Sequence, residues 1–212
     1  IHAPEQFINQ AQQLQQDWSL ADRKIMTLAS THAPEEQKLL SVLKPYLLQH
    51  PELLCIVVPR HPERFDEVFA ETQKLNLRTQ RRSLEQNIQT DTQVYLADSM
   101  GELWLWLALS QACFVGGSLN EPGGGHNILE PIALNVATVV GPNYFNFQTI
   151  IDEFVQVDAV CVATDAQQVA EQLIKFVFEP EMAEQMNARA QEIMQKNTGS
   201  LTKHIQVINQ YL

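Results

Sequence analysis

The chain has 212 residues, of which 45% are hydrophobic and 18% are charged, and this composition excludes an intrinsically disordered protein. The formal net charge of −11 argues against nucleic acid and against a polybasic membrane-binding surface. The longest apolar run falls short of the ~20 residues that a membrane span needs, and the three cysteines include no Cys-x-x-Cys pair, which indicates free thiols.

Residues 1–22 are rich in glutamine and predict a helical lead-in or linker. From residue 24 onward, short apolar runs alternate with amphipathic segments at the spacing of βαβ units. The predicted strands are 25–29, 53–58, 77–83, 94–97, 112–115, 136–140 and 159–163. The predicted helices are one that starts within 30–36 and ends near 49, followed by 63–75, 103–110, 127–135, 147–154, 167–178, 180–196 and 201–212.

This alternation predicts an α/β fold, namely a Rossmann-like parallel sheet with helices on both faces. We expect one domain over residues 23–200, preceded by the lead-in and followed by a C-terminal helix at 201–212.

Residues 114–131 carry five of the eight glycines of the chain. The pattern predicts a strand that ends in glycines, a loop with a triple glycine, and a helix that starts at Asn127. Glycine lets a ligand approach the backbone closely, and a helix N-terminus offers free N–H groups to an anion. The loop therefore predicts a phosphate site, although it matches neither a Walker loop nor the dinucleotide fingerprint.

Polar residues follow four of the predicted strands, where the ends of a parallel sheet lie along one edge. These motifs are 30–32, 59–61, 98–102 and 123–130. Cations are scarce at this edge, because Lys175 is the only Lys or Arg between Arg82 and Arg189. A phosphate would therefore depend on backbone dipoles, on His126, or on the region of Arg60.

Three candidate residues have two interpretations each. Glu130 lies three residues after Asn127, so it either forms a capping box or accepts hydrogen bonds from ribose hydroxyls. His126 either binds a phosphate or stabilises the loop. Arg60 either binds a phosphate or carboxylate through its planar guanidinium, or forms a surface ion pair with Glu63 or Asp66.

Several motifs together resemble the bacterial 3-deoxy-D-manno-octulosonic acid (Kdo) transferases. They occur in the family's order over most of residues 24–200 and run from 59–64, through 82–83 and 100–103, to 116–119, 124–131, 141–142 and 146–147. Ser99 and Ala137 differ from the residues that are common in the family, and 120–123 is an altered approach to the glycines.

The resemblance implies the C-terminal, donor-binding domain of a GT-B glycosyltransferase, which transfers Kdo from CMP-Kdo to a lipid A precursor with inversion. It implies no catalytic residue in this half, and donor-binding residues at three of the motifs and at the neighbouring positions 103 and 118. These residues are Arg60, His61, Met100, Gly101, Glu102, Leu103, Ser118, Gly124, Gly125, His126, Asn127 and Glu130.

In this interpretation Glu130 holds the ribose, the turn at 100–103 holds cytosine, and Arg60 and His61 meet the phosphate or the Kdo carboxylate. We expect no cofactor and no metal, only the donor CMP-Kdo. The general base, the lipid A precursor and the contact with the cytoplasmic face of the bacterial inner membrane would belong to an N-terminal half. This chain itself would be soluble and inactive alone.

Two alternatives belong to other classes. One is the corresponding half of a GT-B enzyme that uses a UDP-sugar, either a transferase or an epimerase, and the other is a non-catalytic nucleotide-binding module. Preference for cytidine over uridine separates the enzymes.

Overall fold

The structure is a computed structural model that describes the backbone of residues 1–209 and the side chains of residues 1–196. Within this part the chain forms one parallel sheet of seven strands in the order β3-β4-β2-β1-β5-β6-β7. The strands are β1 (Lys24–Thr31), β2 (Leu53–Pro59), β3 (Thr79–Arg81), β4 (Val94–Leu96), β5 (Ala112–Val115), β6 (Ala137–Val140) and β7 (Cys161–Val162). The predicted Rossmann-like parallel sheet is therefore confirmed.

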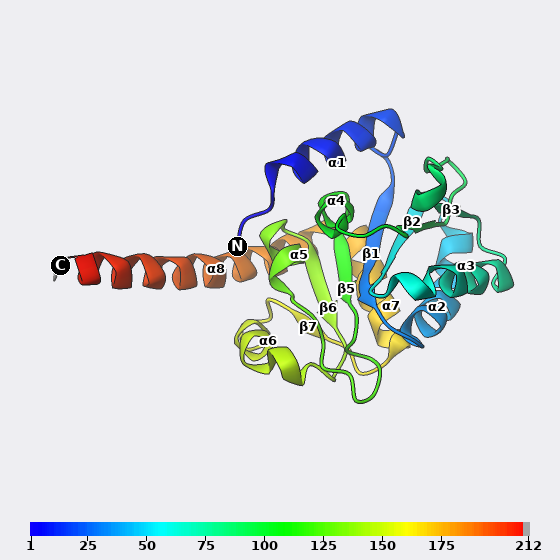
Figure 1. The fold of residues 1–212 in the computed structure, drawn as a ribbon. Coiled ribbons are helices and arrows are strands. Elements are labelled where there is room, and N and C mark those ends of the chain that lie inside the picture. Colours follow the sequence, from blue (N-terminus) through cyan, green and yellow to red (C-terminus); the bar gives the residue numbers. More distant parts are fainter. Residues whose placement is uncertain (210–212) are drawn as a thin grey trace.

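Helices cover both faces of the sheet (Figure 1). They are α1 (Glu5–Asp17), α2 (Glu35–Gln49), α3 (Phe65–Lys74), α4 (Leu103–Ala108), α5 (Leu129–Ala133), α6 (Gln148–Val155), α7 (Ala166–Phe178) and α8 (Pro180–Asn209). Short 3-10 turns lie at η1 (Pro62–Arg64), η2 (Arg82–Leu84) and η3 (Phe145–Phe147).

The central strands are buried on both sides, which explains why they read as continuous apolar runs. Alternate residues of β2 belong to different clusters: Cys55 and Val57 pack with α2, α3 and α7, whereas Leu54 and Ile56 pack with α1 and α4. A third cluster joins β5 and β6 to α5, α6 and α8. The lead-in helix α1 thus packs on the domain through the buried Ala11.

Two helices differ from the sequence prediction. The helix expected from Asn127 begins at Leu129 and has five residues. Ile128 is the N-cap residue of α5, and the side chain of Asn127, which lies just before it, accepts the Leu129 backbone N–H at 3.1 Å.

The two helices predicted at 180–196 and 201–212 form a single helix, α8, whose far end extends away from the sheet (Figure 1). Gly199 lies where the break was predicted. One glycine costs a helix only ~1 kcal/mol relative to alanine, and no proline interrupts the hydrogen bonds there. Residues 201–209 belong to α8, and 210–212 lie outside the described residues.

Candidate functional site

The candidate site lies where the chain changes direction in the sheet. β1 is the middle strand, with β2 on one side and β5 on the other. The β1–α2 turn leads toward β2, whereas the loop after β5 leads the opposite way. In open α/β sheets the crevice between two such carboxyl ends is where ligands bind. All four polar motifs predicted from the sequence follow strands at this edge of the sheet.

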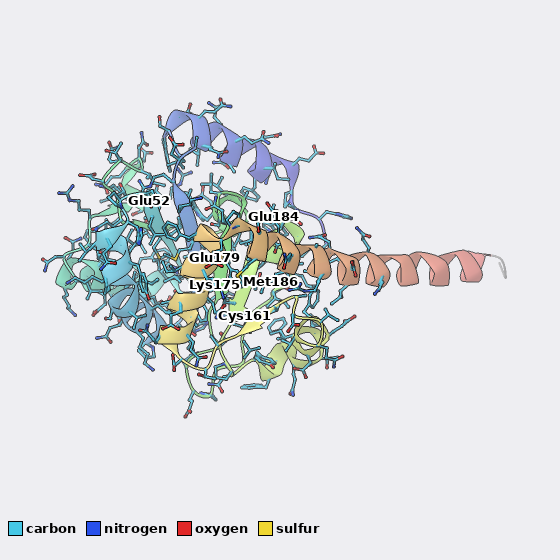
Figure 2. The ribbon with its side chains drawn as sticks, turned by 180° about the vertical axis from the view of Figure 1, so that it is seen from behind. Glu52, Cys161, Lys175, Glu179, Glu184 and Met186 are labelled. Atoms are coloured by element: carbon cyan, nitrogen blue, oxygen red, sulfur yellow. The ribbon has the colours of Figure 1, made fainter. Side chains whose placement is uncertain are left out.

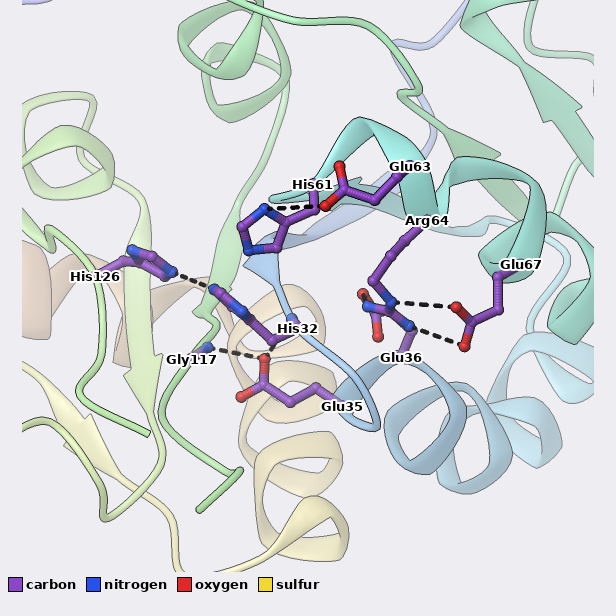
Figure 3. A network of polar contacts seen from close by, with 9 residues as sticks. All are labelled: His32, Glu35, Glu36, His61, Glu63, Arg64, Glu67, Gly117 and His126. Atoms are coloured by element: carbon purple, nitrogen blue, oxygen red, sulfur yellow. Dashed lines mark hydrogen bonds and ion pairs between the residues drawn. The ribbon is translucent and has the colours of Figure 1, made fainter. Parts of the chain in front are cut away.

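Glu35, the first residue of α2, holds the loop after β5. Its carboxylate is fully buried and accepts four backbone N–H groups. Oε2 accepts from His32 at 2.9 Å and from Gly117 at 2.8 Å (Figure 3). Oε1 accepts from Ser118 at 3.0 Å and from Leu119 at 2.9 Å. Burial raises the pKa of Glu35, and the four N–H groups oppose that rise. The first part of the glycine loop is therefore an anion site that is occupied by the protein's own carboxylate.

The two segments approach so closely that Gly116 has no room for a side chain. A Cβ there would lie 2.6 Å from the Ser30 carbonyl oxygen and 2.9 Å from the Glu35 carboxylate. Ser30 itself has a left-handed backbone, with φ of +52°, at an irregularity in the β1–β2 register. The close contact between β1 and β5 thus depends on the absence of a side chain at residue 116.

Three histidines meet above this contact. His32 Nε2 and His126 Nε2 are 2.7 Å apart, and their rings stack with centroids 5.0 Å apart. His61 approaches the His32 ring edge-on, with centroids 4.9 Å apart. Burial, and next the neighbouring His32, lower the pKa of His126 to about 4. Burial and His61 also lower the pKa of His32, so both rings of the pair are neutral at neutral pH.

Arg60 and Glu130 complete this group. Arg60 is exposed, and its backbone N–H donates to the Thr31 carbonyl at 3.0 Å. Burial raises the pKa of Glu130, and the positive charge of Arg60 acts in the opposite direction. Arg60 likewise disfavours a proton on His126. Arg60 therefore lies within electrostatic reach of both residues, at the place predicted for an anion.

The structure excludes one of the two interpretations for Glu130 and one of the two for Arg60. Within the described residues, no hydrogen bond joins the Glu130 carboxylate to the Asn127 N–H, so the capping box is absent. The acids near Arg60 have other partners, since Asp66 pairs with Arg81 at 2.8 Å and Glu63 lies beside His61 at 3.9 Å. Arg60 has no ion pair in the described part of the chain, which leaves its guanidinium available to a ligand.

The triple-glycine loop differs from the prediction in how it uses its N–H groups. Gly124 donates to the Asn143 carbonyl at 2.9 Å, and Gly125 donates to the Gly117 carbonyl at 2.8 Å. These two N–H groups are not free for a phosphate. Those of His126 and Asn127 have no acceptor among the described residues. Because α5 is short, its dipole adds little to this site.

The glycines of this loop instead permit close packing. A Cβ at Gly124 would lie 2.3 Å from Nδ2 of Asn146, and φ is +126° there. The loop is thereby held against residues 143–146, which follow β6.

The turn after β4 forms a separate part of the site, in which Glu102 is held by hydrogen bonds. Glu102 accepts two hydrogen bonds from Arg82, at 3.0 and 2.7 Å, and a further one from Ser99. Partial burial opposes ionisation of Glu102, but the hydrogen bonds from Arg82 and Ser99 outweigh it and lower its pKa. Within this turn Gly101 has φ of +80°, and Met100 is 57% exposed.

Gly124, Gly125 and Asn127 belong to the loop described above, and the other nine predicted site residues fall into three groups. The structure brings Arg60, His61, His126 and Glu130 together. It places Met100, Gly101 and Glu102 in the neighbouring turn and Leu103 at the start of α4. Ser118 is fully buried: its hydroxyl donates to the Val115 carbonyl at 2.7 Å and accepts the Gly141 N–H at 2.8 Å. Ser118 thus supports the loop from below.

Two residues of this network are absent from the predicted donor-binding residues, namely His32, which belongs to the predicted polar motif 30–32, and Glu35. Both lie in a segment that carries ordinary helix-start signals, which account for an acid in the first turn. The position of His32 directly after the first strand indicates a residue at the edge of the sheet. Nothing in the sequence, however, predicts that His32 contacts His126.

A cavity of about 360 Å³ lies elsewhere, between β7, α7 and α8, where Cys161 and Met186 line it (Figure 2). Arg189 is the cation among its described lining residues, and its guanidinium already donates to the Asp158 carbonyl at 3.0 and 2.7 Å. This cavity therefore does not offer a free cation to an anionic ligand.

Across the described residues, no three His, Cys, Asp or Glu side chains are grouped in a way that would hold a metal ion. In the same part of the chain, no helix has the length and apolar character needed to cross a membrane.

Known proteins match most of this chain. The family described as glycosyl transferases group 1 matches residues 12–193. The 3-deoxy-D-manno-octulosonic acid transferases of Haemophilus influenzae and Bordetella pertussis are 36% and 29% identical over 192 and 196 residues. Each match covers 90% of this chain but 45% of the relative, so the chain spans less than half the length of these proteins.

Solved structures agree with this. The crystal structure of the C-terminal CMP-Kdo binding domain of WaaA from Acinetobacter baumannii is 64% identical, with a TM-score of 0.89, and the match covers 91% of this chain and 100% of that one. Anabaena HepE in complex with UDP-glucose, at 16% identity and a TM-score of 0.62, shares the fold over 96% of this chain and 53% of that one. The chain therefore belongs to the glycosyl transferases of group 1, where it has the C-terminal GT-B domain, and within them to the Kdo transferases.

Proposed function

We propose that this chain is the half of a Kdo transferase that binds the donor CMP-Kdo, and that the donor lies at the carboxyl ends of β1, β2, β4 and β5. The observation that carries the proposal is the grouping of Arg60, His126 and Glu130 at the β1–β5 crevice. Arg60 and Glu130 have no ion-pair or hydrogen-bond partner for their side chains among the described residues, although they lie within electrostatic reach of each other.

In this proposal each group meets one part of the donor. Arg60 and His61, with His126, would bind the phosphate or the Kdo carboxylate through charge and N–H groups. Glu130 would accept hydrogen bonds from the ribose hydroxyls. The turn at Met100 would hold cytosine through backbone groups, with the exposed thioether lying against the base.

Transfer would proceed with inversion. A hydroxyl oxygen of the acceptor bonds to the anomeric carbon of Kdo, the bond from that carbon to the phosphate oxygen breaks, and CMP leaves with the electron pair. The hydroxyl proton goes to a general base outside this chain. Arg60 and the N–H groups of His126 and Asn127 would stabilise the charge that grows on the leaving phosphate, and such fixed donors contribute most when they are already in place.

The remaining functions belong to the part of the relatives that this chain does not match. We infer that the general base, the groove for the lipid A precursor and the contact with the cytoplasmic face of the inner membrane lie there. This half alone would bind the donor without transferring Kdo. It would use N–H groups and Arg60 in place of a metal ion, so EDTA should leave CMP binding unchanged.

Calorimetry with CMP, UMP and AMP tests the proposal. We expect CMP to bind with a Kd of roughly 0.1–1 mM, about 4–5.5 kcal/mol, and UMP and AMP to bind more weakly. Tighter binding of UMP would favour an enzyme that uses a UDP-sugar. Equal binding of all three would reduce the site to a general phosphate site and contradict the proposal.

A further inference from the structure

The contact between His32 and His126 constrains how protons are placed on both rings. Their Nε2 atoms are 2.7 Å apart, so one of them must carry the proton that the other accepts. A neutral imidazole carries one N–H, and the hydrogen bond made by one nitrogen determines the state of the other. The two rings therefore have two arrangements. His126 either accepts at Nε2 and carries a proton on Nδ1, or donates at Nε2 and leaves Nδ1 as a lone pair.

The surroundings hold both rings in this contact. Glu35 fixes the His32 backbone N–H and the Gly117 N–H with the same oxygen, Oε2. The His126 ring lies against Gly117, where a Cβ would be 3.1 Å from two of its ring atoms. A side chain at residue 117 would push the His126 ring away from His32.

The charged neighbours disfavour the protonation of either ring to an imidazolium, so the pair keeps one proton on each ring. Arg60 and His61 act on both rings, while Glu36 and Arg64 act on His32 with opposite signs. Arg64 is itself paired with Glu36 at 2.7 Å. Without a ligand, His32 and His126 are therefore both neutral at neutral pH. A ligand can change which of the two Nε2 atoms carries the proton that they share.

An anion distinguishes the two arrangements. A phosphate oxygen accepts a hydrogen bond from Nδ1–H of His126, whereas an Nδ1 lone pair repels it. Figure 3 shows that the second nitrogen of His126 is turned away from His32. The arrangement that suits an anion therefore requires His32 to donate its Nε2–H.

We propose that His32 is a positioning residue of the donor site, which holds His126 in the tautomer that presents an Nδ1–H group to the phosphate of the nucleotide. This inference rests on the proposed function. His32 lies in the β1–α2 turn and acts only through His126. It should therefore affect phosphate binding by the donor site without touching the ligand.

The test uses this chain with ¹⁵N-labelled histidine, and it reads the tautomers of both rings by NMR with and without CMP. We expect saturating CMP to place the proton on Nδ1 of His126 in the parent. His32→Phe keeps the ring volume but removes the donor, and should weaken CMP binding about tenfold, which corresponds to 1.4 kcal/mol. His32→Gln retains an N–H donor and should restore most of the affinity.

His50→Phe is the matched control, since the His50 ring lies against Phe178, with centroids 4.7 Å apart, and belongs to no part of the site. It should bind CMP as the parent does, and well-dispersed spectra show that each variant is folded. If His32→Phe does not fold, the tautomer of His126 in the CMP complex of the parent tests the inference by itself.

The possible failures are distinguishable. A parent that binds CMP with the Nδ1 of His126 unprotonated overturns the role of His32 and leaves the donor site standing. The same holds if His32→Phe binds CMP as tightly as the parent, or if His32→Gln restores nothing. A parent that does not select CMP overturns the proposed function, and this inference with it.

Discussion

The Glu35 carboxylate accepts the Gly117 backbone N–H at 2.8 Å, which joins the start of α2 to the loop after β5 across 82 positions of the sequence. Three further N–H groups converge on the same carboxylate, so one buried side chain fixes the geometry of the switch point between β1 and β5. The first part of the glycine loop, which resembles a ligand-binding loop in the sequence, therefore binds the carboxylate of Glu35 from the same chain.

Glu35→Gln should lower the free energy of unfolding by about 3 kcal/mol or more, because its amide would turn N–H donors toward backbone donors that are left buried and unsatisfied. Urea unfolding of both proteins measures the loss.

Glu63→Gln provides the control, since the Glu63 side chain is 75% exposed, and it should change the free energy of unfolding by less than about 0.5 kcal/mol. A loss at Glu35 as small as that of the control would show that the four hydrogen bonds are not needed to hold the loop.

Glu130→Gln should weaken CMP binding and leave the unfolding free energy close to that of the parent. The carboxylate has no hydrogen-bond partner among the described residues, so its removal costs the fold little, whereas two ribose hydroxyls would lose a charged acceptor worth about 1.5–3 kcal/mol.

Glu121→Gln is a matched change at an exposed position of the same loop and should leave the affinity for CMP unaltered. Equal affinity for CMP in the parent and in Glu130→Gln would show that Glu130 does not bind the ribose hydroxyls.

Arg60→Ala should weaken CMP binding by about tenfold or more, since the site would lose its unpaired cation. Arg60→Lys keeps the charge but not the planar pair of donors, and should fall between the parent and the alanine variant.

Calorimetry at two salt concentrations measures both effects. The loss for Arg60→Ala should be smaller at high salt, because screening already weakens the interaction of an exposed cation. An alanine variant that binds CMP like the parent would place the phosphate elsewhere.

The free energy of unfolding should depend on pH through His126. Its pKa is about 4 in the folded chain and about 6.5 in the unfolded chain, so between these values only the unfolded chain binds the proton. Stability from this ring is thus complete above pH 6.5 and falls as the pH drops toward 4, by at most about 1.4 kcal/mol per pH unit. His32 contributes with the same sign, whereas the raised pKa values of Glu35 and Glu130 act oppositely.

Urea unfolding of the parent and of His126→Phe over pH 4–7 isolates the contribution of this one ring. The variant should lose less stability on acidification than the parent does. An identical pH dependence in the two proteins would mean that the ring titrates normally in the folded chain.

The sheet could be predicted from the sequence because its strands are buried on both faces. The run at 53–58 became β2, and 112–115 became β5 without a shift. Asp165 caps α7, the helix predicted at 167–178, because its side chain accepts the Gln168 N–H at 2.9 Å. These features depend on local patterns of one segment.

The rest depends on contacts between segments, which a local pattern does not carry. Glu35 looks like an ordinary acid of a first helical turn until the loop after β5 closes over it. The triple glycine predicts a loop, but the tight fit against Asn146 explains its composition without a ligand. Asn127 fits the start of a helix in the sequence, but α5 begins two residues later, and the Asn127 side chain accepts the Leu129 N–H from outside the helix.

The most direct test of the central claim is to locate the nucleotide by NMR on the assigned chain. CMP should shift the resonances of Arg60, His126 and Glu130 together with those of the turn at Met100, and UMP should do so only at higher concentrations. Shifts confined to another face of the domain, or equal responses to CMP and UMP, would contradict a CMP-selective donor site at the β1–β5 crevice.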